Sequence, residues 1–534
     1  MRRYILLFIT IIIFLSSGCS QKANVDQDLV AALDFGVTSL DPAYLRLLSE
    51  QYIACNLWEG LVRRNQAGSI EPGVAESWNI SKDGMQYIFS LRKNARWSDG
   101  EPITAYHFEY AWKRALDPNK NSAVVSMMYF LKNGQAYNKK KAKIDDVGVK
   151  ATDDYTLEVT LENPTPYFLE ILNYHTYYPT RPDIIKKNLD SWDKKPYTMM
   201  SNGPFYLVDW DYNKEIKTLK NPYYWDQSNV KLNSLTFLIE RRDNEDVWNR
   251  YLNKEIHYGY VFPEDLDIQK VIESKEHNVT LENYPCTFYL CLNSKNKPFD
   301  NIKVRQALEL ALNKNRIVQK RNYGEEAATG FIPPGIPDGQ PKTDFRKKGG
   351  DLTSKDFTSQ NIIKAKALLK EAGYTNISDF PTVVMLARDS QTVKYIEDEW
   401  EKNLGINVEV NVCKEGLYSQ KRNSRDFDVI VADWIADFLD PINFLGYLAS
   451  EYAFKDIFPS NYYSLVEKSI TTTDNLLRME LLHKAEKTLL DSYTLIPLFY
   501  KKDAYYLQPY VKGFFKSSLA EIHFRNCYIQ NSSR

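Results

Sequence analysis

The sequence contains few histidines, few cysteines and no excess of charge of one sign. Its 534 residues include six histidines and six cysteines, and 68 Lys and Arg against 69 Asp and Glu give a formal net charge of −1. A chain without a basic excess lacks the electrostatic footprint of a nucleic-acid-binding protein. The histidines lie far apart, without the paired spacing of a metal site. We therefore expect no nucleic acid partner, no metal and no cofactor.

Several enzyme motifs are also absent from the sequence. There is no Gly-x-Ser-x-Gly elbow, no His-Glu-x-x-His pair and no glycine loop that could cradle a phosphate. Asp99 and Glu101 are close in sequence and could suggest a catalytic pair of carboxylates. They lie in a predicted turn, however, where two carboxylates exposed to water are the simpler interpretation. We expect a protein that is not an enzyme.

Long apolar runs are lacking except at the N-terminus. Arg2 and Arg3 precede the run Tyr4–Leu15, and three small residues separate that run from Cys19. This order predicts an export signal over residues 1–18, and the run is shorter than the ~20 apolar residues of a membrane span. The cysteine makes the signal resemble that of a bacterial lipoprotein, in which the thiol becomes a lipid anchor. Conventional cleavage with an unmodified Cys19 is the alternative, and either route places the protein outside the cytoplasm.

The remaining cysteines are five in number, so they cannot all pair within the chain. They are Cys55, Cys286, Cys291, Cys413 and Cys527. Cys286 and Cys291 lie five residues apart in a predicted strand, on opposite faces, and cannot bridge there. We interpret the five mostly as small buried apolar residues. One long-range disulfide stays open.

The length exceeds what one hydrophobic core supports, so two or three domains are expected. In the first half, strands are predicted at 29–35, 205–209 and 216–220, with a hairpin at 147–161 and a helix capped by Thr104. After residue 286, strands at 383–386, 406–412 and 427–432 alternate with helices at 304–312, 362–372 and 395–404. This alternation predicts a mostly parallel sheet covered by helices. The Pro- and Gly-rich stretch 329–350 predicts a long surface loop at the rim of a cleft.

Several separated segments resemble one known family. Glu71–Trp78, Tyr87–Arg92 and Ala95–Gly100 resemble the signature of extracellular solute-binding proteins of the oligopeptide and dipeptide class, solute-binding protein family 5. These proteins serve ATP-binding-cassette (ABC) importers. Further matches follow in the same order at 39–42, 58–61, 149–159, 202–205, 297–299, 304–308 and 365–373. The resemblance covers nearly the whole chain after the signal.

The resemblance implies an α/β, periplasmic-binding-protein-like fold with two lobes, three domains and a hinge of two crossovers near residues 285 and 504. The main domain of lobe 1 would comprise 29–47, 188–285 and 505–534, with a smaller domain, 48–187, inserted into it. Lobe 2 would comprise 286–504, and residues 19–28 would form a lipid-anchored tether. The implied partners are an oligopeptide ligand, the transmembrane permease subunits of an ABC importer and a bacterial membrane, which the chain, expected to be a monomer, contacts through its lipid.

The segment Phe427–Asp437 is an apolar strand that ends in an aromatic residue and a carboxylate. A protein that binds many peptide sequences must rely on groups that all peptides share, which are the backbone and the α-ammonium. By its position in this motif, Asp437 matches the aspartate that relatives use for the ammonium. Asp437 could instead cap the following helix, but Asp440 directly before Pro441 is the better cap.

Other candidates surround Asp437. Trp434 is expected in a cleft wall, with core packing as the alternative. Backbone groups expected to pair with peptide belong to Asp433, Ile435 and Val37. Tyr260 and Tyr289 are weaker candidates near the hinge, for which core packing is equally consistent with the sequence.

The sequence departs from its relatives where some of them bind a peptide carboxylate. Val431 replaces an arginine, Glu415 replaces a tryptophan, and Ser390–Val393 lacks a histidine. One hypothesis is a preference for longer peptides whose carboxylate stays in water. Alternatives to peptide import are a family member that binds a metal chelate, haem, a sugar or a modified peptide, a peptide-sensing receptor, and a secreted enzyme.

Overall fold

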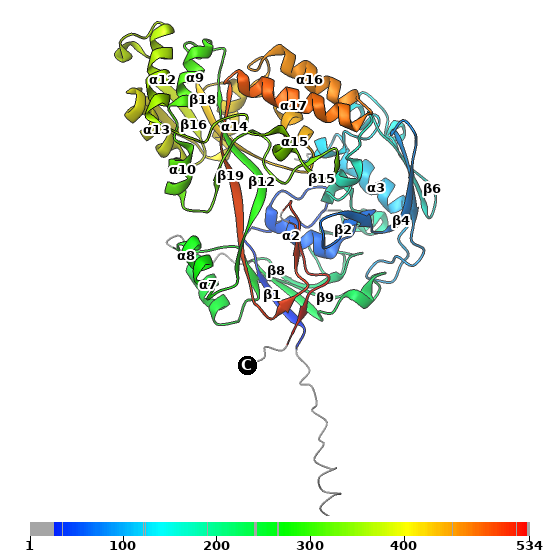
Figure 1. Ribbon diagram of the computed structural model, residues 1–534. Coiled ribbons are helices and arrows are strands. Elements are labelled where there is room, and N and C mark those ends of the chain that lie inside the picture. Colours follow the sequence, from blue (N-terminus) through cyan, green and yellow to red (C-terminus); the bar gives the residue numbers. More distant parts are fainter. Residues whose placement is uncertain are drawn as a thin grey trace, which may run out of the picture.

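The computed structural model describes residues 26–530 except 35, 121, 123, 190, 240–242, 264–265, 451 and 520 (Figure 1). The expected signal at 1–18, Cys19 and most of the expected tether lie outside the described residues, as do 531–534. Within the part of the chain that the structure describes, no helix combines the length and the apolar character needed to cross a membrane.

One sheet runs through both lobes. Its strand order is β17-β16-β18-β12-β19-β11-β1-β10-β9-β8, and β13 pairs with β19. These strands are β1 (Asp28–Ala32), β8 (Phe205–Asp211), β9 (Glu215–Lys220), β10 (Ser234–Leu238), β11 (Tyr258–Gly259), β12 (Val279–Leu292), β13 (Glu326–Ala327), β16 (Val383–Ala387), β17 (Val408–Val412), β18 (Val429–Ile435) and β19 (Leu495–Leu507).

Two long antiparallel strands, β12 and β19, connect the lobes. They run from β1, β8 and β9 of lobe 1 to β16 and β18 of lobe 2 (Figure 1). Their register shifts between Asn283 and Thr287. Pro285 lies inside this interval, and a proline has no N–H to donate to a ladder. The pairing is therefore interrupted between the two lobes.

Lobe 1 carries a second, four-stranded antiparallel sheet, of order β4-β5-β7-β6. Its strands are β4 (Ala75–Ile80), β5 (Gln86–Leu91), β6 (Val149–Asp153) and β7 (Thr156–Thr160). Helix α3 (Ala105–Ala115) packs on β6 and β7. Its buried residues include Phe108 and Trp112, as the spacing predicted. His107 Nδ1 accepts a hydrogen bond of 2.9 Å from the Thr104 N–H and closes the first turn.

The sheet of lobe 2 is mixed, so the prediction of a mostly parallel sheet was wrong. β16 pairs in parallel with β17 and β18, but β18 pairs antiparallel with β12, and β12 pairs antiparallel with β19. The directions of β12 and β19 follow from their crossing between lobes, whereas strand-helix alternation governs only the outer three strands. Helices α9 (Ile302–Leu310), α12 (Ser359–Glu371) and α13 (Ser390–Leu404) contribute Val304, Leu369 and Trp400 to the lobe's core.

The stretch 329–350 is not the predicted surface loop. Phe331, Ile332 and Phe345 are fully buried, and the stretch forms β14 (Pro337–Asp338), β15 (Gln340–Asp344) and α11 (Phe345–Gly349). The buried carboxylate of Glu486 accepts hydrogen bonds of 2.9 Å from the N–H groups of Phe331 and Ile332. The Pro and Gly residues correctly indicated irregular backbone, but the apolar side chains between them pack inward, and Glu486 satisfies the buried backbone.

The other helices are α2 (Leu48–Leu57), α4 (Gly134–Asn138), α5 (Phe168–Ile171), α6 (Pro182–Lys187), α7 (Asn244–Leu252), α8 (Ile268–Ser274), α10 (Lys314–Arg321), α14 (Glu415–Ser424), α15 (Pro441–Ser450), α16 (Ser460–Thr471) and α17 (Asn475–Asp491), with 3₁₀ turns such as η1 (Val125–Met128). The remaining short strands are β2 (Val62–Arg64), β3 (Ile70–Pro72), β20 (Val511–Lys512), β21 (Phe515–Lys516), β22 (Ile522–His523) and β23 (Tyr528–Ile529).

All five cysteines of the described chain are free thiols. Four of them are buried, as expected for small apolar residues, and Cys413 is partly exposed. The long-range disulfide that the sequence left open does not form among the described residues.

Candidate functional site

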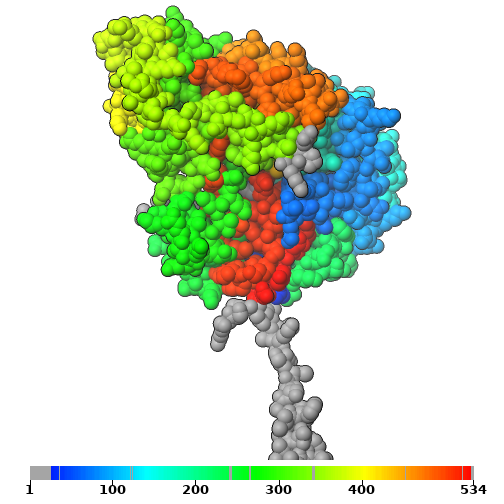
Figure 2. Space-filling view, viewed as in Figure 1, coloured from blue at the N-terminus to red at the C-terminus, as the bar shows by residue number. Residues whose placement is uncertain are grey.

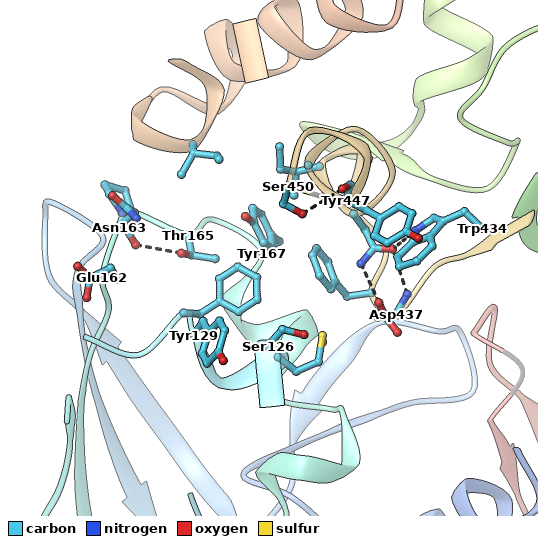
Figure 3. Close-up of a pocket in the computed structure, with 18 residues that line it drawn as sticks. Ser126, Tyr129, Glu162, Asn163, Thr165, Tyr167, Trp434, Asp437, Tyr447 and Ser450 are labelled. Atoms are coloured by element: carbon cyan, nitrogen blue, oxygen red, sulfur yellow. Dashed lines mark hydrogen bonds between the residues drawn. The ribbon is translucent and has the colours of Figure 1, made fainter. Parts of the chain in front are cut away.

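A cavity of about 310 Å³ lies between the lobes, beside Asp437 (Figure 3). Lobe 2 contributes the end of β18, the helix α15 and Ile470 of α16, whereas η1 and the segment 162–167 come from lobe 1. Figure 2 shows α16 and α17, in orange, above the blue and cyan part of lobe 1. The lining residues are Ser126, Met127, Tyr129, Phe130, Glu162, Asn163, Pro164, Thr165, Tyr167, Trp434, Asp437, Phe438, Ile442, Asn443, Gly446, Tyr447, Ser450 and Ile470.

Asp437 lies between the end of β18 and the start of α15. The Ala436 N–H donates to the Pro285 carbonyl (2.9 Å), which holds the chain against β12 up to this point. Asp440 accepts a hydrogen bond of 2.9 Å from the Ile442 N–H, so it caps the first turn of α15, as the sequence predicted. The helix therefore does not depend on the carboxylate of Asp437 for its cap.

Asn443 is the main partner of Asp437. Its Oδ1 accepts from the Asp437 N–H (3.1 Å), and its Nδ2 donates to Asp437 Oδ2 (3.3 Å). No basic side chain among the described residues forms an ion pair with Asp437. Burial raises the pKa of the Asp437 carboxyl to about 6, although the hydrogen bond from Asn443 acts in the opposite direction. The Asp437 side chain is partly exposed and lines the cavity, so a cation that enters the cavity can reach it.

Aromatic rings form much of the wall around this carboxylate. Trp434 stacks on Tyr447 with ring centroids 3.4 Å apart, and Trp434 Nε1 donates to Asn443 Oδ1 (2.9 Å). Phe438 stacks on Tyr167 of lobe 1, with centroids 5.1 Å apart. The cavity is thus bounded by flat apolar faces contributed by both lobes.

One edge of β18 has no strand partner among the described residues beyond Val429 and Ile430. β16 pairs only with Val429 and Ile430, and the Tyr418 hydroxyl donates to the Val431 carbonyl (3.0 Å) on the same side. Neighbouring residues of a strand turn their backbone groups to opposite sides. Since the Ala436 N–H points to β12, the backbone groups of Asp433 and Ile435 point away from β12, to the edge that no described strand covers.

Arg388 is a residue of this edge that the sequence analysis did not identify. It directly follows β16, and its guanidinium pairs with the Asp433 carboxylate and with Glu415 (3.1 Å). The sequence analysis named Glu415 and residues 390–393 as departures from the family pattern. Arg388 lies two residues before 390–393 and was not among them. Its place two residues after the end of the predicted strand 383–386 was the available signal.

The other predicted residues do not line the cavity. Val37 is buried in the loop between β1 and α2, which the Glu50 carboxylate holds by accepting from the Thr38 and Leu47 N–H groups (3.0 and 3.1 Å). Tyr260 accepts a hydrogen bond of 3.0 Å from the Asp34 N–H. Tyr289 is 1 % exposed and meets the Phe331 ring edge-on at 5.3 Å, inside the core.

The structure thus brings Asp437 and Trp434 together on the cavity, and it adds residues that the sequence analysis missed. The aromatic additions are Tyr129, Phe130, Tyr167, Phe438 and Tyr447, and Asn443 adds an amide beside Asp437. Three of them come from lobe 1, far from Asp437 in sequence, and no local pattern indicates that contact. In the described part of the chain, no group of three or more His, Cys, Asp or Glu is arranged to hold a metal ion.

Comparison with known proteins gives a consistent family. The profile of the bacterial extracellular solute-binding proteins, family 5 (middle), matches residues 69–456. The chain therefore belongs to family 5 of the bacterial extracellular solute-binding proteins.

Individual relatives match over nearly the whole chain. It is 34 % identical over 515 residues to the periplasmic oligopeptide-binding protein OppA of Salmonella typhimurium, covering 94 % of this chain and 92 % of that one. The crystal structure of Haemophilus influenzae OppA in complex with RPPGFSPFR superposes with a TM-score of 0.76 at 29 % identity, covering 95 % of this chain and all of that one. The Escherichia coli murein tripeptide binding protein MppA gives a TM-score of 0.77 at 28 % identity, covering 95 % and 99 %.

Proposed function

We propose that the protein is the extracytoplasmic peptide-binding subunit of an ABC importer, and that it captures oligopeptides by their backbone and free α-amino group. The observation that carries this proposal is the Asp437 carboxylate, which lies without a basic partner among the described residues at a cavity between two lobes. The named relatives that bind oligopeptides or a murein tripeptide support the same ligand class.

The proposed binding uses two parts of the peptide, its α-ammonium and its backbone. The α-ammonium would donate to Asp437, where a charge-assisted hydrogen bond is stronger than a neutral one and offsets the cost of the buried charge. The peptide backbone would pair with Asp433 and Ile435 at the open edge of β18. Trp434 would pack against the ligand. Contacts with Val37, Tyr260 and Tyr289 stay predictions.

The domain division and the cell-surface context belong to the same proposal. We propose that lobe 1 comprises 29–47, 188–285 and 505–534 with 48–187 inserted, that lobe 2 comprises 286–504, and that the lobes close by bending at β12 and β19. The interruption of their pairing near Pro285 supports this hinge. We further propose that residues 1–18 direct export, that Cys19 carries a lipid anchor to the membrane, and that the loaded monomer docks on permease subunits.

Native mass spectrometry of protein purified from its host tests the proposed ligand class. We expect co-purified masses that fragment as peptides with free amino ends. Titration calorimetry should then show that such a peptide binds more tightly than its N-acetylated form, because the acetyl group removes the positive charge. Co-purification of haem, a metal chelate or a sugar, with no peptide binding, would overturn the proposal.

Peptide affinity is expected to fall in acid. The raised pKa of Asp437, about 6, means that the ligand-free carboxyl takes up a proton below that pH. A bound ammonium needs the ionised form, so binding at low pH requires loss of this proton. Affinity for free-amino peptides should fall by up to about tenfold per pH unit below pH 6 and change little from pH 6.5 to 7.5, where Asp437 is mostly ionised and the peptide ammonium mostly protonated. Calorimetry from pH 4.5 to 8 measures this, and a flat profile would contradict the role of Asp437.

A further inference from the structure

We propose that the cavity beside Asp437 selects peptides whose first residue carries a large apolar side chain, preferably an aromatic one. This inference rests on the proposed function, because it takes Asp437 as the partner of the α-ammonium. Asp437 would bind the α-ammonium, which all these peptides share, so it gives no preference among side chains. The cavity would add that preference.

The first step of the argument is geometric. In an amino acid the nitrogen and the Cβ are both bonded to Cα and lie about 2.5 Å apart. A peptide whose ammonium contacts Asp437 therefore starts its first side chain at the wall of this cavity. The volume of about 310 Å³ falls at the lower end of the range of ~300–1,000 Å³ typical of ligand pockets. The space is large enough for a bulky side chain, and a glycine or alanine would leave most of it unfilled.

The second step is the chemistry of the walls. Rings of Phe130, Tyr167 and Phe438 pack together on one side, with Phe130 edge-on to Phe438 at 5.9 Å. Trp434 and Tyr447 lie together on another side, as Figure 3 shows. Stacked and edge-to-face contacts with such rings favour an aromatic guest beyond the burial of its area.

The third step concerns charge. None of the described residues that line the cavity is a Lys, Arg or His. Glu162 is the one lining carboxylate besides Asp437, and its side chain is exposed and accepts from the Asn133 N–H (2.8 Å). The side-chain carboxylate of a first residue Asp or Glu would have no cationic partner among these lining residues, and Asp437 would repel it. Peptides that begin with Asp or Glu should therefore bind most weakly.

Gly446 sets the depth of the cavity. It lies within α15, where glycine is a poor helix former, and it lines the space with no side chain. A Cβ at Gly446 would meet only Ile442 side-chain atoms, at 3.3 and 3.4 Å, so a longer side chain there would extend into the cavity. Gly446 is thus the position at which the available volume can be changed without touching Asp437.

The test is a calorimetric series with Phe-Ala-Ala-Ala, Ala-Ala-Ala-Ala and Asp-Ala-Ala-Ala. The Phe-first peptide should bind the wild-type protein about 10- to 100-fold more tightly than the Ala-first peptide, the range expected for burying a Phe side chain. The Asp-first peptide should be the weakest. In the Gly446→Leu protein the ratio of Phe-first to Ala-first affinity should fall close to one, because the new side chain occupies space that a large first side chain would fill.

Gly416→Leu is the matched control. Gly416 is also a helical glycine of lobe 2, but it is exposed in α14, and a Cβ there meets nothing within 4 Å. This variant should keep the full preference. Equal affinity of the wild type for Phe-first and Ala-first peptides would overturn the inference and leave the proposed function intact. Failure of every free-amino peptide to bind would overturn the proposed function instead. An unchanged ratio of the two affinities in folded Gly446→Leu would also contradict the inference.

Discussion

Asp437→Ala is expected to weaken the binding of free-amino peptides by at least about 2–3 kcal/mol, because it removes a charged hydrogen-bond partner from an enclosed site. An ammonium left in the cavity would have no other ionised side chain of the described residues at hand except the exposed Glu162. Calorimetry with one peptide in free and N-acetylated forms measures the effect. The acetylated form should lose much less, and equal losses for both forms would rule out the ammonium role.

Asp437→Asn separates this effect from unfolding. Asparagine keeps the shape of the side chain and can still bond Asn443. The folded-state pKa of Asp437 is raised above its ordinary value of 3.8, so its contribution to folding is present below pH 4 and is lost as the pH rises through about 6. At pH 7.5 the ligand-free Asp437→Asn protein should therefore be at least as stable as the wild type in urea unfolding. A large drop in stability would show that the carboxylate has a structural role instead.

Local parts of this site could be predicted from the sequence. The end of an apolar strand, the carboxylate after it and the Asp440-Pro441 start of a helix lie within a few residues of each other, and propensity and capping act over that distance. The same local rules predict Asp440, and not Asp437, as the cap of α15, and the hydrogen bond from the Ile442 N–H to Asp440 confirms this prediction.

The wall that lobe 1 contributes could not be predicted in this way. Tyr167 and Phe438 stack although they are far apart in the sequence, and only the packing of the lobes brings them together. The two wrong predictions have the same origin. The direction of β12 is set by its crossing between lobes, and the buried N–H of Phe331 finds its partner in Glu486, which lies on a helix much later in the chain.

Arg478→Met is expected to lower the free energy of unfolding by about 3–5 kcal/mol, because it leaves a buried carboxylate without its charged partner. Arg478 of α17 is 1 % exposed, and Asp440 is 5 % exposed. The guanidinium pairs with both oxygens of Asp440 and lies 4.7 Å from the centre of the Tyr167 ring. Methionine keeps most of the apolar part of the arginine side chain. The loss of stability therefore reflects mainly the removed charge and not a change in packing volume. Urea unfolding at pH 7.5 measures it.

Lys487→Met provides the control on the same helix. Lys487 and Asp491 form an ion pair whose side chains are 62 % and 61 % exposed, so its removal should cost less than about 0.5 kcal/mol. Combining Arg478→Met with Asp440→Asn should recover part of the lost stability, because asparagine still caps a helix and leaves no unpaired charge in the core. A cost below about 1 kcal/mol for Arg478→Met would show that solvent reaches Asp440 easily, in which case the ion pair does not hold α15 in place beside Asp437.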